Sequence, residues 1–434
     1  MKAIINATTY DFENYKEGQY LLFDKKIVTC GAMEDFVDEG YEIIDGKDHL
    51  IMPSLVNGHS HIYSTFARGM SLPFSPNNFV EILEQLWWRL DSALALEDVY
   101  HSGVVYSRDT LLNGVTTVID HHASGAISGS LNELKKAVVE EAGMRGIFCF
   151  ETSDRFDLLE CIHENLSFAK SNTGNHCAGL FGIHASMTLS ETSLKTISDH
   201  IGDLPLHMHI AESKYDQSES LLNYGKRIIE RLDDHGLLKA NSLLAHCLYI
   251  DDEERKLIAA KGCRVVYNVT SNMNNSVGLP DYIKLKSKEI PVLIGNDGLS
   301  TGMTNEWLNM IYSMHLKYQT PKTFGFENLR GMINQNYAYV NELLGVKLGR
   351  IEEGYESDIL MIPYIPPTPM NASNALGHVL YGLANSFRPR HVWCGGKQLV
   401  RDFEVGDHHL QNYRESCASA SRVWQRLEDD EPFK

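Results

Sequence analysis

Short apolar runs alternate with amphipathic stretches along most of the chain. Eight of these runs are rich in β-branched residues and have the length of strands: residues 50–58, 114–120, 145–151, 178–183, 204–209, 242–246, 263–268 and 290–296. Between them lie segments with helical spacing, such as 131–142 and 251–260, and the second begins with a cluster of acidic residues. Strands and helices that alternate in this way favour parallel βα units, and therefore an α/β protein.

The polar residues at the ends of these runs indicate how the units are arranged. Eight βα units fit a closed (β/α)8 TIM-type barrel, but an open doubly wound sheet has the same alternation. The runs end, in order, at His59 and His61, Asp120-His121-His122, Glu151, His184, His209 and Glu212, His246, Asn268 and Asp297. An open sheet needs polar ends only near its switch point, whereas a barrel builds its active site from many strand ends. The pattern therefore favours the barrel.

The two ends of the chain follow a different pattern. Residues 1–52 and 345–410 contain short strand-like pieces separated by turns, and neither segment could bury a core alone. We therefore expect them to meet as one small β-sandwich domain beside a barrel catalytic domain of residues 53–344. Residues 411–434 are predicted to form a charged terminal helix.

Composition narrows the class of protein. Hydrophobic residues make up 43% and charged residues 22% of the 434 residues, which is typical of a soluble globular protein. The formal net charge of −18 argues against nucleic acid as a partner. The N-terminus lacks the apolar region of a signal peptide, and no run reaches the roughly 18 apolar residues of a membrane span. We expect a cytoplasmic protein with no membrane partner, whose eight dispersed cysteines are reduced thiols.

Several strand ends carry residues suited to binding a metal ion. Side chains alternate along a strand, so His59 and His61 point the same way and could bind one ion. His209 adds a third imidazole, and Glu212 is near enough to move protons. His246 could instead be a satisfied core histidine, and Asp297 a turn or helix-capping residue. Together, however, so many buried polar groups would be costly unless a cation paired them.

These residues resemble a known family. The order His59-x-His61, His209-x-x-Glu212, His246 and Asp297 resembles the amidohydrolase superfamily, in particular its mononuclear deaminase and chlorohydrolase (ATZ/TRZ-like) branch. Segments 62–70, 81–91 and 118–124 are similar to SsnA-type aminohydrolases, which are associated with purine catabolism.

The resemblance implies one divalent metal ion, Zn2+ with Fe2+ or Mn2+ as alternatives, bound by His59, His61, His209 and Asp297. Binuclear relatives use a lysine on the fourth strand, and residues 178–184 contain none. The ion would lower the pKa of its water from roughly 15.7 toward about 7, so that hydroxide exists at neutral pH.

The implied reaction is the hydrolysis of a C–N bond in a planar nitrogen heterocycle, with release of ammonia. Glu212 would pass a proton from the water to a ring nitrogen, His246 would orient the hydroxide or stabilise the oxyanion, and Asp297 would relay a proton to ammonia. An alternative within the superfamily is a ring-opening cyclic amide or amidine hydrolase, and a non-enzymatic alternative is an inactive barrel scaffold.

The residues that select the substrate are predicted on separate grounds. His184 resembles the family's substrate-binding histidine on the fourth strand. Of the pair His121-His122, we expect His121 to face the barrel mouth. Arg155 could bind an anionic or carbonyl-rich group or form a surface salt bridge. Trp88, with its neighbour Trp87, could stack on a planar ring or simply pack in a helix. The resemblance also implies a homodimer or larger homo-oligomer, with residues 414–424 as a candidate interface.

Overall fold

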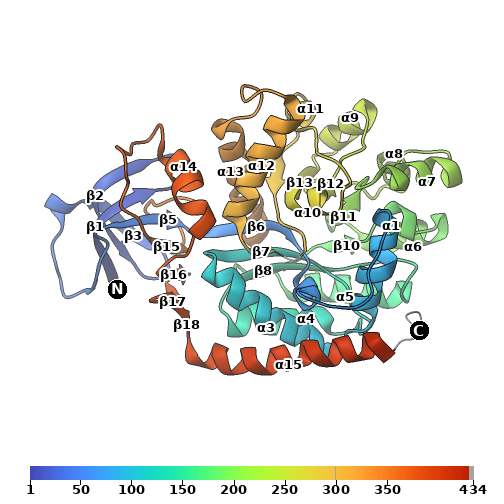
Figure 1. The fold of residues 1–434 in the computed structure, drawn as a ribbon, viewed down its shortest axis with the longest axis horizontal. Coiled ribbons are helices and arrows are strands. Elements are labelled where there is room, and N and C mark those ends of the chain that lie inside the picture. Colours follow the sequence, from blue (N-terminus) through green and yellow to red (C-terminus); the bar gives the residue numbers. More distant parts are fainter. Residues whose placement is uncertain (299, 430–434) are drawn as a thin grey trace.

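A closed barrel of parallel strands forms the larger part of the computed structural model, which describes residues 1–298 and 300–429 (Figure 1). Two sheets make up its wall. The first contains β6 (Leu55–Ser60), β7 (Val115–His122), β8 (Arg145–Phe150) and β9 (Cys177–Gly179). The second contains β10 (Phe181–Ile183), β11 (Leu206–Ile210), β12 (Leu243–His246), β13 (Arg264–Tyr267) and β14 (Val292–Ile294).

Two parallel bridges join these sheets into a ring. Thr152 pairs with Ile183, and Ser60 pairs with Asp297. At the second junction β6 and β14 approach closely, since a Cβ added to Gly295 would lie only 2.5 Å from the backbone nitrogen of His59. Glycine is therefore required where the barrel closes next to the candidate ligands.

Helices surround the barrel, as Figure 1 shows. Its helical elements are η2 (Ile62–Ala67), α1 (Phe79–Ile82), η3 (Leu83–Trp87), α2 (Trp88–Ser92), α3 (Leu96–Leu112), α4 (Ser130–Lys135), η4 (Lys136–Glu141), α5 (Leu158–Ser171), η5 (Ser186–Thr188), α6 (Glu191–Ile201), α7 (Lys214–Tyr224), α8 (Ile228–Asp234), α9 (Asp252–Ala260), α10 (Val269–Asn274), α11 (Tyr282–Lys286), α12 (Met303–Tyr318) and α13 (Phe326–Leu344). Helix α9 begins as its acidic start predicts: Asp251 accepts hydrogen bonds from the backbone of Glu253 and Glu254.

Nine strands from both ends of the chain form the second part. They are β1 (Lys2–Tyr10), β2 (Tyr15–Phe23), β3 (Ile27–Ala32), β4 (Glu42–Asp45), β5 (His49–Pro53), β15 (Ile359–Pro363), β16 (His391–Cys394), β17 (Lys397–Arg401) and β18 (Glu404–Val405). The antiparallel pairing of β5 with β15 joins the N-terminal strands to the C-terminal ones.

This sheet curls over a core of its own. Strands β2 and β16 are four steps apart in the sheet, or about 19 Å if it were flat. Their side chains Phe23 and Trp393 nevertheless meet with ring centroids 5.6 Å apart. The predicted β-sandwich is thus one continuous hydrogen-bonded sheet that folds around buried apolar side chains.

The structure confirms the predicted fold class, an α/β barrel with a β domain from the two termini, and it corrects three details. The expected strand 50–58 is two strands, because the partner changes at Ser54: Ser54 N donates to Asp358 O, and Leu55 N donates to Gly114 O. The fourth barrel strand is interrupted between β9 and β10. The terminal helix α15 begins earlier than predicted, at residue 407 (Asp407–Asp429), and residues 430–434 of the predicted helix lie outside the described residues.

Helix α15 lies against α3 of the same chain (Figure 1). Ser419 donates a hydrogen bond to Asp98, and Trp424 donates one to the backbone of Phe66. One face of the terminal segment proposed as an interface therefore packs within the chain, while residues such as Arg414, Glu415 and Arg422 on it are exposed. Among the described helices, none is both long and apolar enough to span a bilayer.

Candidate active site

Three histidines and one aspartate converge at the C-terminal end of the barrel. His59 lies on β6, His61 just after it, His209 on β11, and Asp297 after β14. The Nε2 atom of His61 lies 3.0 Å from His209 Nε2 and 2.9 Å from Asp297 Oδ1. His59 Nε2 lies 3.3 Å from the same Asp297 oxygen. Ligand atoms at this spacing can share one cation at ordinary metal–ligand distances.

Contacts on the opposite side of each ring decide which nitrogen is available. His61 Nδ1 lies 2.6 Å from the backbone oxygen of His121, and His209 Nδ1 lies 2.9 Å from that of His184. A carbonyl oxygen only accepts, so Nδ1 carries the hydrogen and Nε2 presents a lone pair. Two lone pairs that face each other at 3.0 Å repel unless a positive charge lies between them. His59 Nε2 is also buried without a hydrogen-bond partner. The residues present therefore fit a divalent metal ion.

Asp297 supplies the negative charge of this cluster. Burial opposes its ionisation, but the neighbouring imidazoles of His59 and His61 hold the pKa of its carboxyl well below the usual range. For His61, burial by itself lowers the pKa of the imidazole, but the neighbouring Asp297 carboxylate outweighs this effect and raises it to about 9. At neutral pH a proton therefore lies between His61 and Asp297 unless a metal ion replaces it.

Glu212 and His246 lie beside the cluster. His246 Nδ1 lies 2.8 Å from Asn272 Oδ1, while its Nε2 lies 3.4 Å from Glu212 Oε2 and 3.8 Å from Asp297 Oδ2. Glu212 Oε1 is buried without a hydrogen-bond partner, and burial raises the pKa of this carboxyl to about 7. His246 and Asp297 both have positive φ angles, 68° and 61°, which non-glycine residues rarely adopt. Such strain is typical of positions where function fixes the direction of a side chain.

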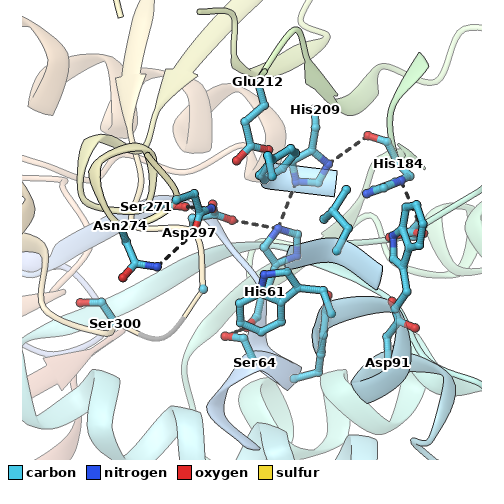
Figure 2. Close-up of a pocket in the computed structure, with 18 of the residues that line it drawn as sticks. His61, Ser64, Asp91, His184, His209, Glu212, Ser271, Asn274, Asp297 and Ser300 are labelled. Atoms are coloured by element: carbon cyan, nitrogen blue, oxygen red, sulfur yellow. Dashed lines mark hydrogen bonds and ion pairs between the residues drawn. The ribbon is translucent and has the colours of Figure 1, made fainter. Parts of the chain in front are cut away.

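A cavity of about 290 Å³ opens in front of this cluster. Figure 2 shows His61 near its centre, with His184 and Asp91 on one side and Ser271, Asn274 and Ser300 on the other. Its apolar walls come from Tyr63, Phe79, Leu83, Trp87 and Trp88. An apolar slot with few polar groups suits a planar ring.

The predicted substrate-binding residues divide into two pairs. His184 and Trp88 line the cavity, with their rings 6.1 Å apart. Arg155 is not among the residues that line the cavity, and its guanidinium binds Asp91 and Glu151 in a largely buried ion pair rather than a surface salt bridge. The ring of His121 lies 4.7 Å from that of His209, whereas His122 contacts Ser124. His121 is nevertheless fully buried beside His209, hydrogen-bonded to the backbone of Ile183, and is not part of the cavity wall.

The sequence analysis missed His207 and the carboxylate of Asp91. His207 Nε2 lies 2.8 Å from His59 Nδ1, on the opposite side of that ring from Asp297. The spacing His207-x-His209 repeats that of His59-x-His61, so alternation along the strand could have identified it. Asp91 carries no comparable signal, because it comes from a helical segment rather than from a strand end.

Known proteins are similar to this chain in sequence and in fold. The sequence profile of the amidohydrolase family matches residues 50–399. The chain belongs to the amidohydrolase family. This confirms the family predicted from the sequence and, with it, a hydrolase that acts on carbon–nitrogen bonds.

Individual relatives cover nearly the whole chain. A 5'-deoxyadenosine deaminase of Methanosphaera stadtmanae is 28% identical over 413 residues, which are 92% of this chain and 93% of the relative. A 5-methylthioadenosine/S-adenosylhomocysteine deaminase of Caldanaerobacter subterraneus is 28% identical over 84% of each chain. The crystal structure of a zinc-bound adenosine deaminase from Xanthomonas campestris has a TM-score of 0.83 at 20% identity, covering 99% of this chain and 98% of its own. At this identity the last comparison supports the fold alone.

Proposed function

We propose that this protein is a zinc-dependent aminohydrolase that releases ammonia from a planar nitrogen heterocycle of the purine type. The observation that carries the proposal is the convergence of three imidazole Nε2 atoms and one carboxylate, next to the buried and unpaired oxygen of Glu212. The relatives named as deaminases of adenine nucleosides support the purine class.

The residues have separate roles in this proposal. His59, His61, His209 and Asp297 would hold the ion, which when bound supplies a water of lowered pKa. Glu212, with its pKa raised to about 7, takes a proton from water and delivers it to a ring nitrogen. Because His246 Nδ1 faces Asn272 Oδ1, its Nε2 can accept a hydrogen bond and orient the water that attacks the ring, and Asp297 passes a proton to the departing ammonia.

The same site could open a cyclic amide or amidine without releasing ammonia, and this stays the second candidate. An inactive scaffold is disfavoured. Buried polar atoms without hydrogen-bond partners, such as those of His59 and Glu212, destabilise the fold, and a scaffold without activity has no use for them.

The test combines metal loading with a substrate panel. The purified protein is loaded with zinc, iron or manganese and assayed for ammonia release and loss of ring absorbance on adenosine, 5'-deoxyadenosine, guanine and pterin. Glu212→Gln is expected to bind metal normally and to lose at least about 100-fold in kcat/KM. Glu253→Gln, an exposed substitution on α9, is the control. Near-normal turnover by Glu212→Gln would exclude the proposed proton transfer, and ring opening without ammonia would favour the second candidate.

A further inference from the structure

Apart from its histidines, the charged side chains that line the cavity are all acidic among the described residues. They are Asp91, Glu151, Glu212 and Asp297, and the described lining contains neither lysine nor arginine. Asp91 lies on the side of His184, away from Ser271, Asn274 and Ser300 (Figure 2), and Glu151 Oε1 lies 4.0 Å from His184 Nδ1. The cavity therefore has an acidic end and a neutral polar end.

Arg155, which binds two of these carboxyl groups, is already engaged by them. Arg155 contacts Asp91 through both of its terminal nitrogens, at 2.6 and 3.0 Å, and Glu151 at 2.8 Å. Its guanidinium also lies over the ring of Trp88, 5.0 Å from the centroid. Arg155 would have to break this network to bind a substrate anion, so it serves the cavity wall rather than a ligand.

One oxygen at the acidic end has no partner. Glu151 Oε1 accepts hydrogen bonds from Arg155 and Ser153, but within the described part of the chain no hydrogen bond reaches Oε2. Burial raises the pKa of this carboxyl to about 7, although the neighbouring Arg155 opposes the shift. Glu151 can accept a hydrogen bond from a ligand, but it cannot attract an anion.

The charge balance leads to the same result. Two of the four carboxyl groups share the single guanidinium of Arg155, and the other two lie beside the proposed metal position, so the described lining offers an anion no free basic side chain. The low dielectric of an enclosed site strengthens repulsion between like charges.

We propose that the substrate is an uncharged or cationic heterocycle, and that Asp91 and Glu151 exclude ring compounds that carry a phosphate or carboxylate group. These two residues determine specificity and take no part in the reaction. This selection by charge rests on the proposed function where it is tested by kinetics. The binding test below does not depend on that function.

Matched ligands that differ in charge test it on the metal-loaded, unsubstituted protein. The pairs are adenosine with adenosine 5'-monophosphate and pterin with 6-carboxypterin, and 5'-amino-5'-deoxyadenosine supplies a cation. We expect kcat/KM for the anionic member to be lower by at least about 30-fold, because like charges in such a site repel strongly. The amine is expected to match or exceed adenosine. Values within threefold for both pairs would overturn the proposal.

Substitutions then identify the residues responsible. Glu151→Gln and Asp91→Asn each remove one negative charge and leave Arg155 less neutralised. Each is therefore expected to reduce the ratio of kcat/KM between the uncharged and the anionic ligand of a pair by about tenfold. Glu253→Gln, far from the cavity, should leave the ratio unchanged. If both cavity variants fold, as judged by circular dichroism, and keep the original ratio, these residues do not select the substrate.

A binding assay separates this proposal from the proposed reaction. Quenching of tryptophan fluorescence reports ligands that reach Trp87 and Trp88 in the cavity wall. Tighter binding of inosine than of inosine 5'-monophosphate supports charge selection even if no adenine nucleoside is deaminated. Equal or tighter binding of the phosphate, or no binding of any uncharged ligand, contradicts it.

Discussion

At the scale of single residues, the hydrogen bond made by one ring nitrogen of a histidine determines whether the other nitrogen can bind a metal ion. The contact between His207 and His59 is an example. If His59 presents Nε2 to a metal ion, its Nδ1–H must donate to His207 Nε2, and His207 Nδ1–H then points to Cys149 Sγ at 3.5 Å. His207 therefore holds one tautomer of His59.

Removing this contact should weaken metal binding. We expect His207→Leu to lower zinc affinity about 10- to 100-fold, as found for partners of ligating histidines. His207→Gln should recover part of the loss, because its amide oxygen can accept the same hydrogen bond. Competition with a chromogenic chelator measures the affinity. His122→Leu is the control, since His122 is equally buried but bonds to Ser124. Unchanged affinity in a folded His207→Leu protein would rule out this role.

The same scale shows what the sequence could and could not reveal about the site. The four candidate ligands, with Glu212 and His246, were found because strand ends meet at one edge of a parallel barrel. The position of Arg155 could not be predicted. Its partner Asp91 is 64 residues away, on a helix whose orientation no periodicity specifies.

At the scale of elements, the helical segment before α3 shows how local geometry shapes the cavity. Trp87 and Trp88 are neighbours in sequence, and in a regular α-helix neighbours point about 100° apart. Here η3 is a π-helical turn, and both indoles line the cavity. Such turns often occur at functional sites. The sequence pattern predicted a helix here, but it carries no sign of the inserted turn.

Helices α10 and α12 are joined by a carboxyl group with an unusual pKa. Glu306 on α12 accepts hydrogen bonds from the backbone and hydroxyl of Thr270, which lines the cavity. Burial raises the pKa of Glu306 to about 7, above its ordinary value of 4.5.

This shift predicts how stability depends on pH. The folded state binds more protons than the unfolded state between pH 4.5 and 7, so this group's contribution to stability falls as pH rises through that window. Glu306→Gln should reduce the difference in the free energy of unfolding between pH 5 and pH 8 by on the order of 2 kcal/mol. Urea unfolding at pH 5 and pH 8 measures it, with Glu253→Gln as control. Parallel pH profiles for Glu306→Gln and the unsubstituted protein would contradict the assignment.

At the scale of the whole molecule, a buried ion pair joins the barrel to the β domain. Arg145 at the start of β8 is fully buried and binds Asp358 through two nitrogens at 2.9 Å, and Glu356 at 3.2 Å. The exposed Lys26 contacts the same Glu356 at 3.4 Å. These two cations thus share a carboxylate but differ in burial.

The two cations should differ sharply in their effect on stability. Arg145→Ala leaves Asp358 without its buried partner and is expected to cost roughly 3–5 kcal/mol, whereas Lys26→Ala should cost no more than about 1 kcal/mol. Guanidinium unfolding of the two variants provides the comparison. Similar losses for both would show that this junction does not depend on the buried pair.

The pairing of β5 with β15 has a consequence for how the protein is made. Pro53 leaves the ribosome about 300 residues before Ile359, its partner across the sheet, which at roughly 5–20 residues per second is a delay of about 15–60 s. During this interval one edge of β5 has no partner, although the strand leads directly into His59 and His61. An unpaired edge is prone to join other chains. The candidate metal ligands of the first barrel strand are therefore synthesised early, whereas the last strand that pairs with the segment before them is synthesised late.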